Sequence, residues 1–343
     1  MLKLGDVILA KDGSTLGTVN WVKHLPGPTT VNSSLAVIRP NNTILSAFLF
    51  RWISSSKMQS LIERYKDGQG VPHLFQSDIR KFSVILPPFS EQQAIAAFLD
   101  RETGKLDALI EKKKKLVELL KEKRTALISH AVTKGLDPNV KMKPSGIAWI
   151  GDVPEQWDVK PLRYLFDNLD NKRIPLSSEE RGGLDKIYPY YGASGIIDYV
   201  DDYIYDETLI LVAEDGANLL SRSTPLAFRA EGKYWVNNHA HILRPKYNVT
   251  SYWENLLQIF DFTPYVSGSA QPKLTGDNLG SFQLPVPPLP EQQAIAKYLD
   301  IETGKIDVLI GKAEAAVEKL KEYRTALISA TVTGKIDVRE LVK

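Results

Sequence analysis

Two stretches of the chain place apolar residues at steps of three and four, which is the spacing of an amphipathic helix. Charged residues occupy the remaining positions, as in the run from Lys112 to Lys115. Each pattern predicts a helix of roughly 30 residues, or about 45 Å at 1.5 Å per residue. The apolar positions are Leu106, Leu109, Ile110, Leu116, Val117, Leu120, Leu127, Ile128 and Ala131 in the first stretch, and Ile306, Leu309, Ile310, Ala313, Val317, Leu320, Leu327, Ile328 and Thr331 in the second.

The two helical stretches are copies of one sequence. Residues 91–133 recur as residues 291–333 without a gap, and about 29 of the 43 positions are identical. The similarity continues upstream, where ILAKDGSTL matches ILVAEDGANL, VNSSLAVIRP matches VNNHAHILRP, and VPHLFQSDIRKFSVILPP matches QPKLTGDNLGSFQLPVPP. The chain is therefore an internal duplication in which a globular domain and a helix alternate twice.

Each predicted helix needs an apolar partner, and the most similar apolar stripe in the chain belongs to its own copy. We therefore expect the two helices to pair as an antiparallel coiled coil, which would place the two globular domains at its opposite ends. Because Gly104 and Gly304 interrupt the pattern, we also expect a short leading helix to be separated from each long one.

The start of each helical region carries its own signals. The double prolines at 87–88 and 287–288 disfavour helix immediately upstream. Ser90 and Pro290 then occupy an N-cap or first-turn position. Glu91 and Glu291 follow, where the positive end of the helix dipole favours a carboxylate.

The globular parts have the composition of β-sheet. Residues 186–212 and 234–245 are rich in β-branched and aromatic residues and are punctuated by glycine, proline and aspartate. Helical patterns follow at 252–262 and, in the first half, at 46–65. The sequence thus predicts an α+β fold in which two β-rich domains alternate with two long helices.

The composition shifts and the repeat also define domain boundaries. We expect a first β-rich domain at 1–89, a first helical region at 90–135, a linker at 136–148, a second β-rich domain at 149–289, a second helical region at 290–336 and a tail at 337–343.

Length, charge and cysteine content narrow the class of protein. A chain of 343 residues suits two to three domains, and it has no cysteine for a disulfide framework or a cysteine zinc site. The net charge of +2 is low for a stand-alone DNA-binding domain, so a nucleic-acid partner would require local clusters of positive charge or phosphate contacts shared with other subunits. With no signal peptide and no apolar run of about 20 residues, we expect a cytoplasmic protein that does not span a membrane.

The familiar motifs of catalysis are missing. The chain has no GxxxxGK[ST], GxGxxG, HExxH or GxSxG motif and no methyltransferase motif of the DPPY or NPPF kind. Asp215 with residues 231–233 could be forced into a nuclease pattern, but such a triplet often arises by chance. His239 and His241 alternate along a predicted strand without a third His or Cys ligand nearby. We therefore expect no catalytic residue, no cofactor and no metal.

Several segments together resemble one known family. The segment PPLPEQQAIAKYLDIETGKIDVLI with LKEYRTALISATVTGKID, and WIGDVPEQWDVKPL from Trp149, resemble the specificity subunit of type I restriction–modification systems. The resemblance covers essentially the whole chain, and most of these segments occur twice in the expected order.

The resemblance implies a role in reading double-stranded DNA. Each β-rich domain would be a target-recognition domain for one half of a bipartite site, and the helices would form a spacer that fixes the gap between the halves. The helical region would also bind two modification (methyltransferase) subunits, and the restriction and translocase subunits would join through this core.

The first β-rich domain departs from that pattern because it is short. The second domain runs for roughly 138 residues from Trp149 to its double proline, whereas the first has 86 residues before Pro87. The first begins near the counterpart of Asp206, so about 55 residues have no match, and a β-rich domain without them would expose strand edges and core. An alternative is therefore a truncated or silent specificity subunit that assembles with the methyltransferase without reading a full target. An independent nuclease or methyltransferase is disfavoured by the missing motifs.

Basic and amide side chains on loops are the candidates for DNA contacts in the second domain. Simpler interpretations stand beside them: Tyr190 and Tyr191 could be core aromatics, a turn alone explains Asp215–Gly216, and the lysine run from Lys112 is typical of a solvated helix face. The candidates are Lys172, Arg173, Tyr190, Tyr191, Ser194, Asn218, Arg222, Ser223, His239 and Lys273. In the first half of the chain, His73 is the counterpart of Lys273.

Overall fold

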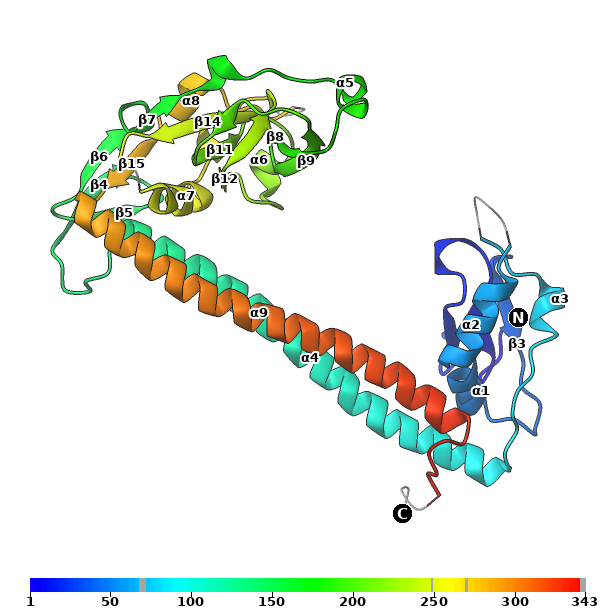
Figure 1. Ribbon diagram of the computed structural model, residues 1–343. Helices are drawn as coiled ribbons and strands as arrows, with labels where there is room; N and C mark the ends of the chain where they lie inside the picture. Colours follow the sequence, from blue (N-terminus) through cyan, green and yellow to red (C-terminus); the bar gives the residue numbers. More distant parts are fainter. Residues whose placement is uncertain (68–71, 248, 269–270, 340–343) are drawn as a thin grey trace. The chain divides into compact units, whose positions relative to one another are not determined.

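The computed structural model describes most of the chain, namely residues 1–67, 72–247, 249–268 and 271–339. The expected tail at 337–343 therefore lies partly outside the described residues. The chain divides into two compact units, and each combines a β-rich part with segments of both long helices (Figure 1). The first unit comprises Met1–Glu118 with Gly311–Lys343, and the second comprises Leu119–Ile310.

The two predicted helices are present and are longer than expected. Helix α4 spans Phe89–Lys134 and helix α9 spans Leu289–Val332, with 46 and 44 residues. Both run without interruption through the two glycines, so the expected break at Gly104 and Gly304 is wrong. A single glycine costs a helix interior only about 1 kcal/mol, which the surrounding regular turns easily offset.

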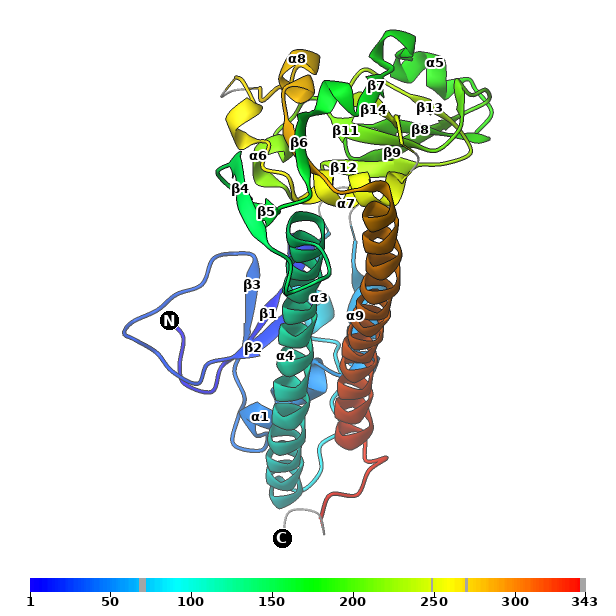
Figure 2. The ribbon, with the colours of Figure 1, turned by 90° about the vertical axis from the view of Figure 1, so that its left-hand side faces the viewer.

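Within each unit, segments of α4 and α9 lie side by side and run antiparallel, as predicted (Figure 2). In the first unit, Arg324 forms an ion pair with Asp107 at 2.7 Å. In the second unit, Arg124 forms an ion pair with Asp307 at 2.9 Å. These two pairs are copies of each other, because positions 107 and 307, and positions 124 and 324, correspond in the repeat.

The apolar stripes are divided between a buried seam and an exposed face. Ile110, Val117, Ile128, Ala131, Ile306, Ala313, Val317, Leu327, Ile328 and Thr331 are buried, and Leu106, Leu120, Ile310 and Leu320 are partly buried. Leu109, Leu116 and Leu309 are exposed instead. Consecutive helical residues point about 100° apart, so both members of a pair such as 109 and 110 cannot face one partner helix.

The first unit contains a small antiparallel sheet covered by helices. Its strands follow the order β2-β1-β3, and Phe48, Ile62 and Leu74 fill the core together with Leu99 and Ile328 from the long helices. The elements are β1 (Val7–Ala10), η1 (Gly13–Thr15), β2 (Val19–Trp21), β3 (Leu35–Ile38), α1 (Ser46–Ile53), α2 (Ser56–Tyr65) and α3 (Gln76–Ile79).

The second unit contains the longer β-rich domain, as predicted. The strands are β4 (Met142–Ile147), β5 (Gly151–Pro154), β6 (Asp158–Pro161), β7 (Phe166–Asn168), β8 (Tyr188–Gly192), β9 (Gly195–Val200), β10 (Tyr205–Asp206), β11 (Leu209–Ala213), β12 (Ala227–Ala230), β13 (Lys233–Val236), β14 (Ala240–Pro245) and β15 (Gln283–Val286). The helices are η2 (Leu162–Tyr164), η3 (Asp170–Lys172), α5 (Ser178–Gly182), α6 (Asn218–Ser221), α7 (Thr250–Ile259), η4 (Thr263–Tyr265) and α8 (Gly276–Gly280).

These strands form two four-stranded sheets and two short pairs. The orders are β12-β11-β14-β7 and β10-β13-β8-β9, and the pairs are β15-β6 and β4-β5. Strand β11 has the sequence LILVA with every residue buried, which is typical of a central strand covered on both faces. Helix α7 packs on this sheet, and its Trp253 lies in the main core beside Phe166 and Phe260.

The β-rich parts repeat each other in detail. In the first unit the Leu74 N–H donates to the Lys11 carbonyl at 2.8 Å, and in the second the Leu274 N–H donates to the Glu214 carbonyl at 2.7 Å. The sheet β2-β1-β3 corresponds to β12-β11-β14. No described element of the first unit corresponds to β4–β10. The described part of the first β-rich domain therefore has a shorter fold than the second domain.

Candidate nucleic-acid interface

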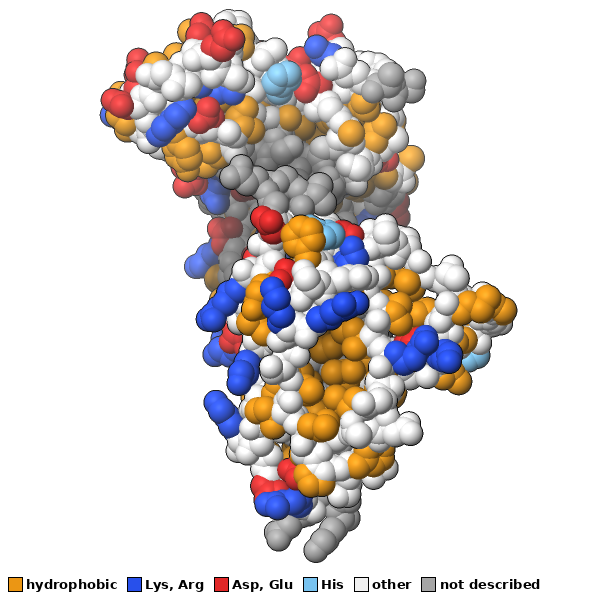
Figure 3. All heavy atoms as spheres, turned by 90° about the vertical axis from the view of Figure 1, so that its right-hand side faces the viewer, with side chains coloured by type: hydrophobic (Ala, Val, Ile, Leu, Met, Phe, Trp, Pro, Cys, Tyr) orange, Lys and Arg blue, Asp and Glu red, His pale blue; other side chains and the backbone are white. Residues whose placement is uncertain are grey.

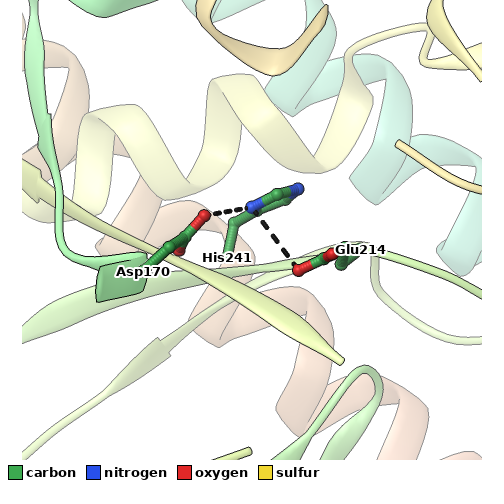
Figure 4. Close-up of side chains that lie close together, drawn as sticks. All are labelled: Asp170, Glu214 and His241. Atoms are coloured by element: carbon green, nitrogen blue, oxygen red, sulfur yellow. Dashed lines mark hydrogen bonds and ion pairs between the residues drawn. The ribbon is translucent and has the colours of Figure 1, made fainter. Parts of the chain in front are cut away.

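A buried polar cluster lies at the end of the central sheet of the second unit (Figure 4). Asp170 comes from η3, Glu214 directly follows β11, and His241 lies on β14. The Nδ1 atom of His241 is 2.5 Å from Asp170 Oδ2 and 3.8 Å from Glu214 Oε2. Sequence analysis compared His241 with His239 and did not find these carboxylates, because one lies 71 residues away along the chain.

Both ring nitrogens of His241 have partners. Its Nε2 lies 2.9 Å from the Leu274 carbonyl oxygen, and its Nδ1 faces the Asp170 carboxylate. Burial alone would raise the pKa of Asp170, but the hydrogen bond and charge of His241, the Ile242 N–H and Arg173 outweigh burial and lower it.

The ligand types in this cluster are compatible with a metal ion, and their donor atoms lie within 4.8 Å of one another. Two cations already neutralise it. The Arg173 guanidinium donates to Glu214 and lies 3.7 Å from Asp170, while the Lys273 ammonium lies 3.3 Å from Glu214. With both His241 nitrogens also engaged, the residues fit a closed ion-pair network better than a metal centre.

The network holds basic side chains at the surface beside it. The Nδ1 of His239 lies 2.8 Å from Asp215 Oδ2, and Asp215 and Lys273 form a β-bridge. The side chains of His239 and Lys273 are 51% and 53% exposed. Lys172 is exposed at the end of η3, whereas Arg173 is mostly buried. The structure therefore brings Arg173, His239 and Lys273 together.

The tyrosines of the β8–β9 hairpin are largely internal. Tyr190 is buried, and its hydroxyl accepts a hydrogen bond from the Leu176 N–H at 2.9 Å. Tyr191 is partly buried and packs against the rings of Phe228 and Tyr234. Ser194 is exposed in the turn between the strands. Of these three candidates, only Ser194 is exposed.

The candidates around α6 are occupied in shaping their own loop. The Asn218 Oδ1 accepts from the Ser223 hydroxyl at 3.0 Å and from the Thr224 N–H at 2.9 Å. Arg222 ends the helix in the left-handed region with φ of 50°, and its guanidinium donates to the Gln258 carbonyl at 2.6 Å. Ser223 and Arg222 remain exposed, so the loop presents them on a fixed backbone.

The weak nuclease pattern is not assembled. Asp215 follows the end of β11, while Glu231 follows the end of β12, and the antiparallel register pairs Leu209 with Ala230. The two acidic residues therefore lie at opposite ends of the β11–β12 pair.

In the first unit, the position equivalent to Lys273 is occupied by His73, another basic residue. His73 forms an ion pair with Asp12, and Lys11 lies 3.1 Å from the same carboxylate. Asp12 and Asp215 are equivalent, because the Gly13 and Gly216 amides donate to the Pro72 and Pro272 carbonyls at 2.9 and 3.0 Å. Sequence analysis identified His73 but missed Lys11, whose counterpart is the acidic Glu214.

Replacing Asp170 by asparagine is expected to destabilise the second unit by about 1–3 kcal/mol at pH 7, because His241 is left without its charged partner. The folded-state pKa of Asp170 lies below its ordinary 3.8, so its contribution is present above about pH 4 and disappears as pH falls through the lowered value. Thermal unfolding from pH 2 to 7 should show the two proteins converging at low pH. The exposed Asp167→Asn variant should follow the unmodified protein, and a constant difference across pH would contradict the charge-based account.

Comparison with known proteins assigns the chain to a family. The model for the type I restriction modification DNA specificity domain matches residues 2–119 and 154–318. The chain belongs to this family. The resemblance expected from the sequence is confirmed, including its duplicated β-rich and helical parts.

Two named specificity subunits are similar over almost the whole chain, and a third is similar over less than half of it. The putative MjaX and the MjaVIII specificity subunits of Methanocaldococcus jannaschii are 26% and 24% identical, and each alignment covers 98% of this chain and 80% of the relative. The putative subunit S.HindORF215P of Haemophilus influenzae is 36% identical over 147 residues, which are 42% of this chain and 37% of that protein.

Solved structures share the fold. A chain from a structure on complex assembly and conformational transition of the type I R-M system has a TM-score of 0.77 at 18% identity, covering 98% of this chain and 83% of that one. The HsdS subunit of Thermoanaerobacter tengcongensis has a TM-score of 0.51 at 18% identity, covering 98% and 82%. Among the described residues, no helix combines the length and apolar character that a membrane crossing requires.

Proposed function

We propose that this chain is the non-catalytic, DNA-reading subunit of a cytoplasmic type I restriction–modification complex. It binds a bipartite double-stranded target and scaffolds two modification subunits together with restriction and translocase subunits. The observation that carries the DNA-reading part is the half-exposed pair His239 and Lys273, held at one strand end by the Asp170–His241 network. In the first unit, His73, the counterpart of Lys273, pairs with Asp12, the counterpart of Asp215.

Basic side chains fixed in this way suit DNA because they can reach phosphates and base edges without further ordering. Each is already paired with a carboxylate, which lowers the local positive charge. This agrees with a net charge of only +2 and with phosphate contacts that are shared with the modification subunits.

The double variant Lys273→Ala, His239→Ala is expected to bind target DNA about tenfold more weakly. The slope of its log affinity against log salt concentration should fall by about one for each phosphate that the variant no longer neutralises. Binding is measured by fluorescence anisotropy over a salt series with the complex of this chain and its modification subunit. Lys160→Ala is the matched control, because Lys160 is an exposed, ion-paired lysine of the same unit. Equal weakening in the control would refute an assignment to the strand-end residues.

The exposed apolar residues of the long helices support the scaffolding part of the proposal. Ile301 and Val308 are exposed and lie seven residues apart on one face of α9 in the second unit, next to the exposed Leu309. An apolar helix face of this kind is a suitable contact for another subunit.

Val308→Asp is expected to weaken the complex with the modification subunit at least tenfold while leaving the melting temperature within about 2 °C, because the side chain is solvent-exposed in the chain alone. Co-purification and light scattering measure assembly, and thermal unfolding measures stability. Val308→Thr keeps the shape and should reduce assembly less. Full assembly of the aspartate variant would place the modification subunit elsewhere.

A second candidate function is a silent or truncated subunit, and the shortened fold of the first unit favours it. Co-expression with a type I modification subunit, followed by mapping of methylated adenines, distinguishes a full reader from a silent subunit. A split methylated motif with two defined halves supports a full reader. A stable complex without methylation supports the silent subunit, and the lack of any complex would contradict both.

A further inference from the structure

An apolar groove of about 360 Å³ lies on the described surface of the first unit. Its lining includes Ile38, Ile44, Trp52, Phe82, Val84 and Leu86. Figure 3 shows hydrophobic side chains gathered on a face of this unit (Figure 3). Isolated hydrophobic side chains are common on protein surfaces, but contiguous ones usually mark a binding surface.

Two unpaired backbone edges border this groove. Strand β3 is the outer strand of the order β2-β1-β3, whereas its copy β14 is followed by β7 in the order β12-β11-β14-β7. Residues 83–86 belong to no described helix or strand, and no described strand pairs with them, whereas their copy β15 pairs with β6. Val37 and Val84 are 38% and 36% exposed, while their copies Ile242 and Leu284 are fully buried.

The second unit shows what covers these edges when the fold is complete. One short segment, Asp158–Asn168, provides both β6 and β7. Between the strands, η2 and the residue after it bury Leu162 and Leu165, and Phe166 packs edge-on against Trp253 with ring centroids 5.3 Å apart. Two strand pairings and three apolar side chains therefore come from a single strand–turn–strand segment.

Charge at the groove matches the same kind of segment. In β14 and β7, Arg244 lies opposite Asp167 in the strand register. The copy of Arg244 is Arg39, which lines the groove and has a half-exposed side chain. The Arg39 guanidinium donates to Asp6 at 2.7 Å, as that of Arg244 donates to Glu207 at 2.8 Å. An incoming carboxylate at the position of Asp167 would therefore lie opposite an arginine that also pairs within its own unit.

The described chain offers no segment to fill this role. The residues just before β1 are already engaged, because the Leu2 N–H donates to the Thr29 carbonyl and the Gly5 N–H donates to the Val22 carbonyl, each at 2.9 Å. In any second copy, Asp158–Asn168 is already committed to its own second unit. The occupant that we consider is therefore a different polypeptide.

We propose that the first unit is an acceptor for a strand–turn–strand segment of a separate polypeptide, which pairs with the β3 edge and with residues 83–86 and fills the groove with aliphatic and aromatic side chains. Backbone pairing supplies much of the affinity in such strand addition, and the pockets supply the specificity. The proposal is independent of DNA reading, because it concerns only the completion of a fold.

The test uses a fluorescent peptide with the sequence of residues 155–169, which performs this role in the second unit, and the full chain. We expect saturable one-to-one binding by anisotropy, and slower hydrogen exchange at both residues 36–39 and residues 83–86. Val84→Asp should weaken binding at least tenfold and still fold, because Val84 is partly exposed, whereas Ile197→Asp, at an exposed position of the second unit, should bind normally. A peptide with aspartate at the positions of Leu162 and Leu165 should not bind.

Three outcomes would overturn the proposal. One is the lack of saturable binding at millimolar peptide to a chain shown to be folded by its thermal transition. Another is protection confined to other segments. The third is a dimer in light scattering whose two edges are already protected, which would make a second copy the occupant. None of these outcomes bears on DNA affinity measured with the modification subunit, so this proposal and the proposed function fail separately.

Discussion

Trp157→Ala is expected to lower the free energy of unfolding of the second unit by about 3–5 kcal/mol. Trp157 is fully buried in the main core, and its Nε1 donates a hydrogen bond to Glu291 Oε2 at 2.9 Å. Alanine would leave a large cavity beneath the start of α9 and would remove the partner of that carboxylate. Urea unfolding followed by tryptophan fluorescence and by hydrogen exchange of the second unit measures the loss.

Trp157→Phe separates the two contributions. It keeps most of the apolar volume and removes only the N–H donor, so its expected cost is about 1–2 kcal/mol. If the alanine variant loses less than about 1 kcal/mol, the core around Trp157 collapses readily and the proposed cavity does not form.

Ile128→Asp is expected to destabilise the second unit by about 4 kcal/mol or more, the second large effect. Ile128 is buried where α4 joins the core that contains Ile295 and Leu299 of α9. A carboxylate there loses its hydration inside an apolar core, which is among the most costly changes a core can undergo. Denaturant unfolding and hydrogen exchange of the second unit measure this loss.

The repeat provides matched controls for this prediction. Ile328→Asp changes the equivalent buried residue in the first unit, so it should destabilise that unit by a similar amount. Leu309→Asp adds the same charge to an exposed position and should cost less than about 1 kcal/mol. Equal losses for Ile128→Asp and Leu309→Asp would show that burial on the helix seam does not determine stability.

Features with a strong local or repeated signal could be predicted from the sequence. The two long helices, their antiparallel pairing and the β-rich parts followed from apolar periodicity and from the internal duplication. The helix breaks were wrong because glycine only weakens a helix. The division of the stripes into buried Ile110 and exposed Leu109 needs the crossing geometry of two helices, which apolarity alone does not define.

The candidate site was less predictable, because its contacts join distant segments. Arg173 could be selected as a basic loop residue, but its ion pair with Glu214 depends on how η3 meets the end of β11. Tyr190 is in a polar-looking segment, yet the parallel pairing of β8 with β13 buries it. Contacts of this kind are set by sheet topology, which short sequence patterns do not contain.

The two mirrored ion pairs of the long helices have a consequence for the ancestry of the protein. Asp107 pairs with Arg324, and Asp307 pairs with Arg124. Each helix therefore contributes an aspartate and an arginine at equivalent positions, and each of these side chains pairs with its opposite on the other helix. Such reciprocal pairs are the residue pattern of a self-complementary interface between two identical helices. Two separate chains, each with one β-rich domain and one helix, already contain every residue of such an interface. Fusion of two such genes would therefore preserve a symmetric dimer within a single chain, and each half would then be free to diverge.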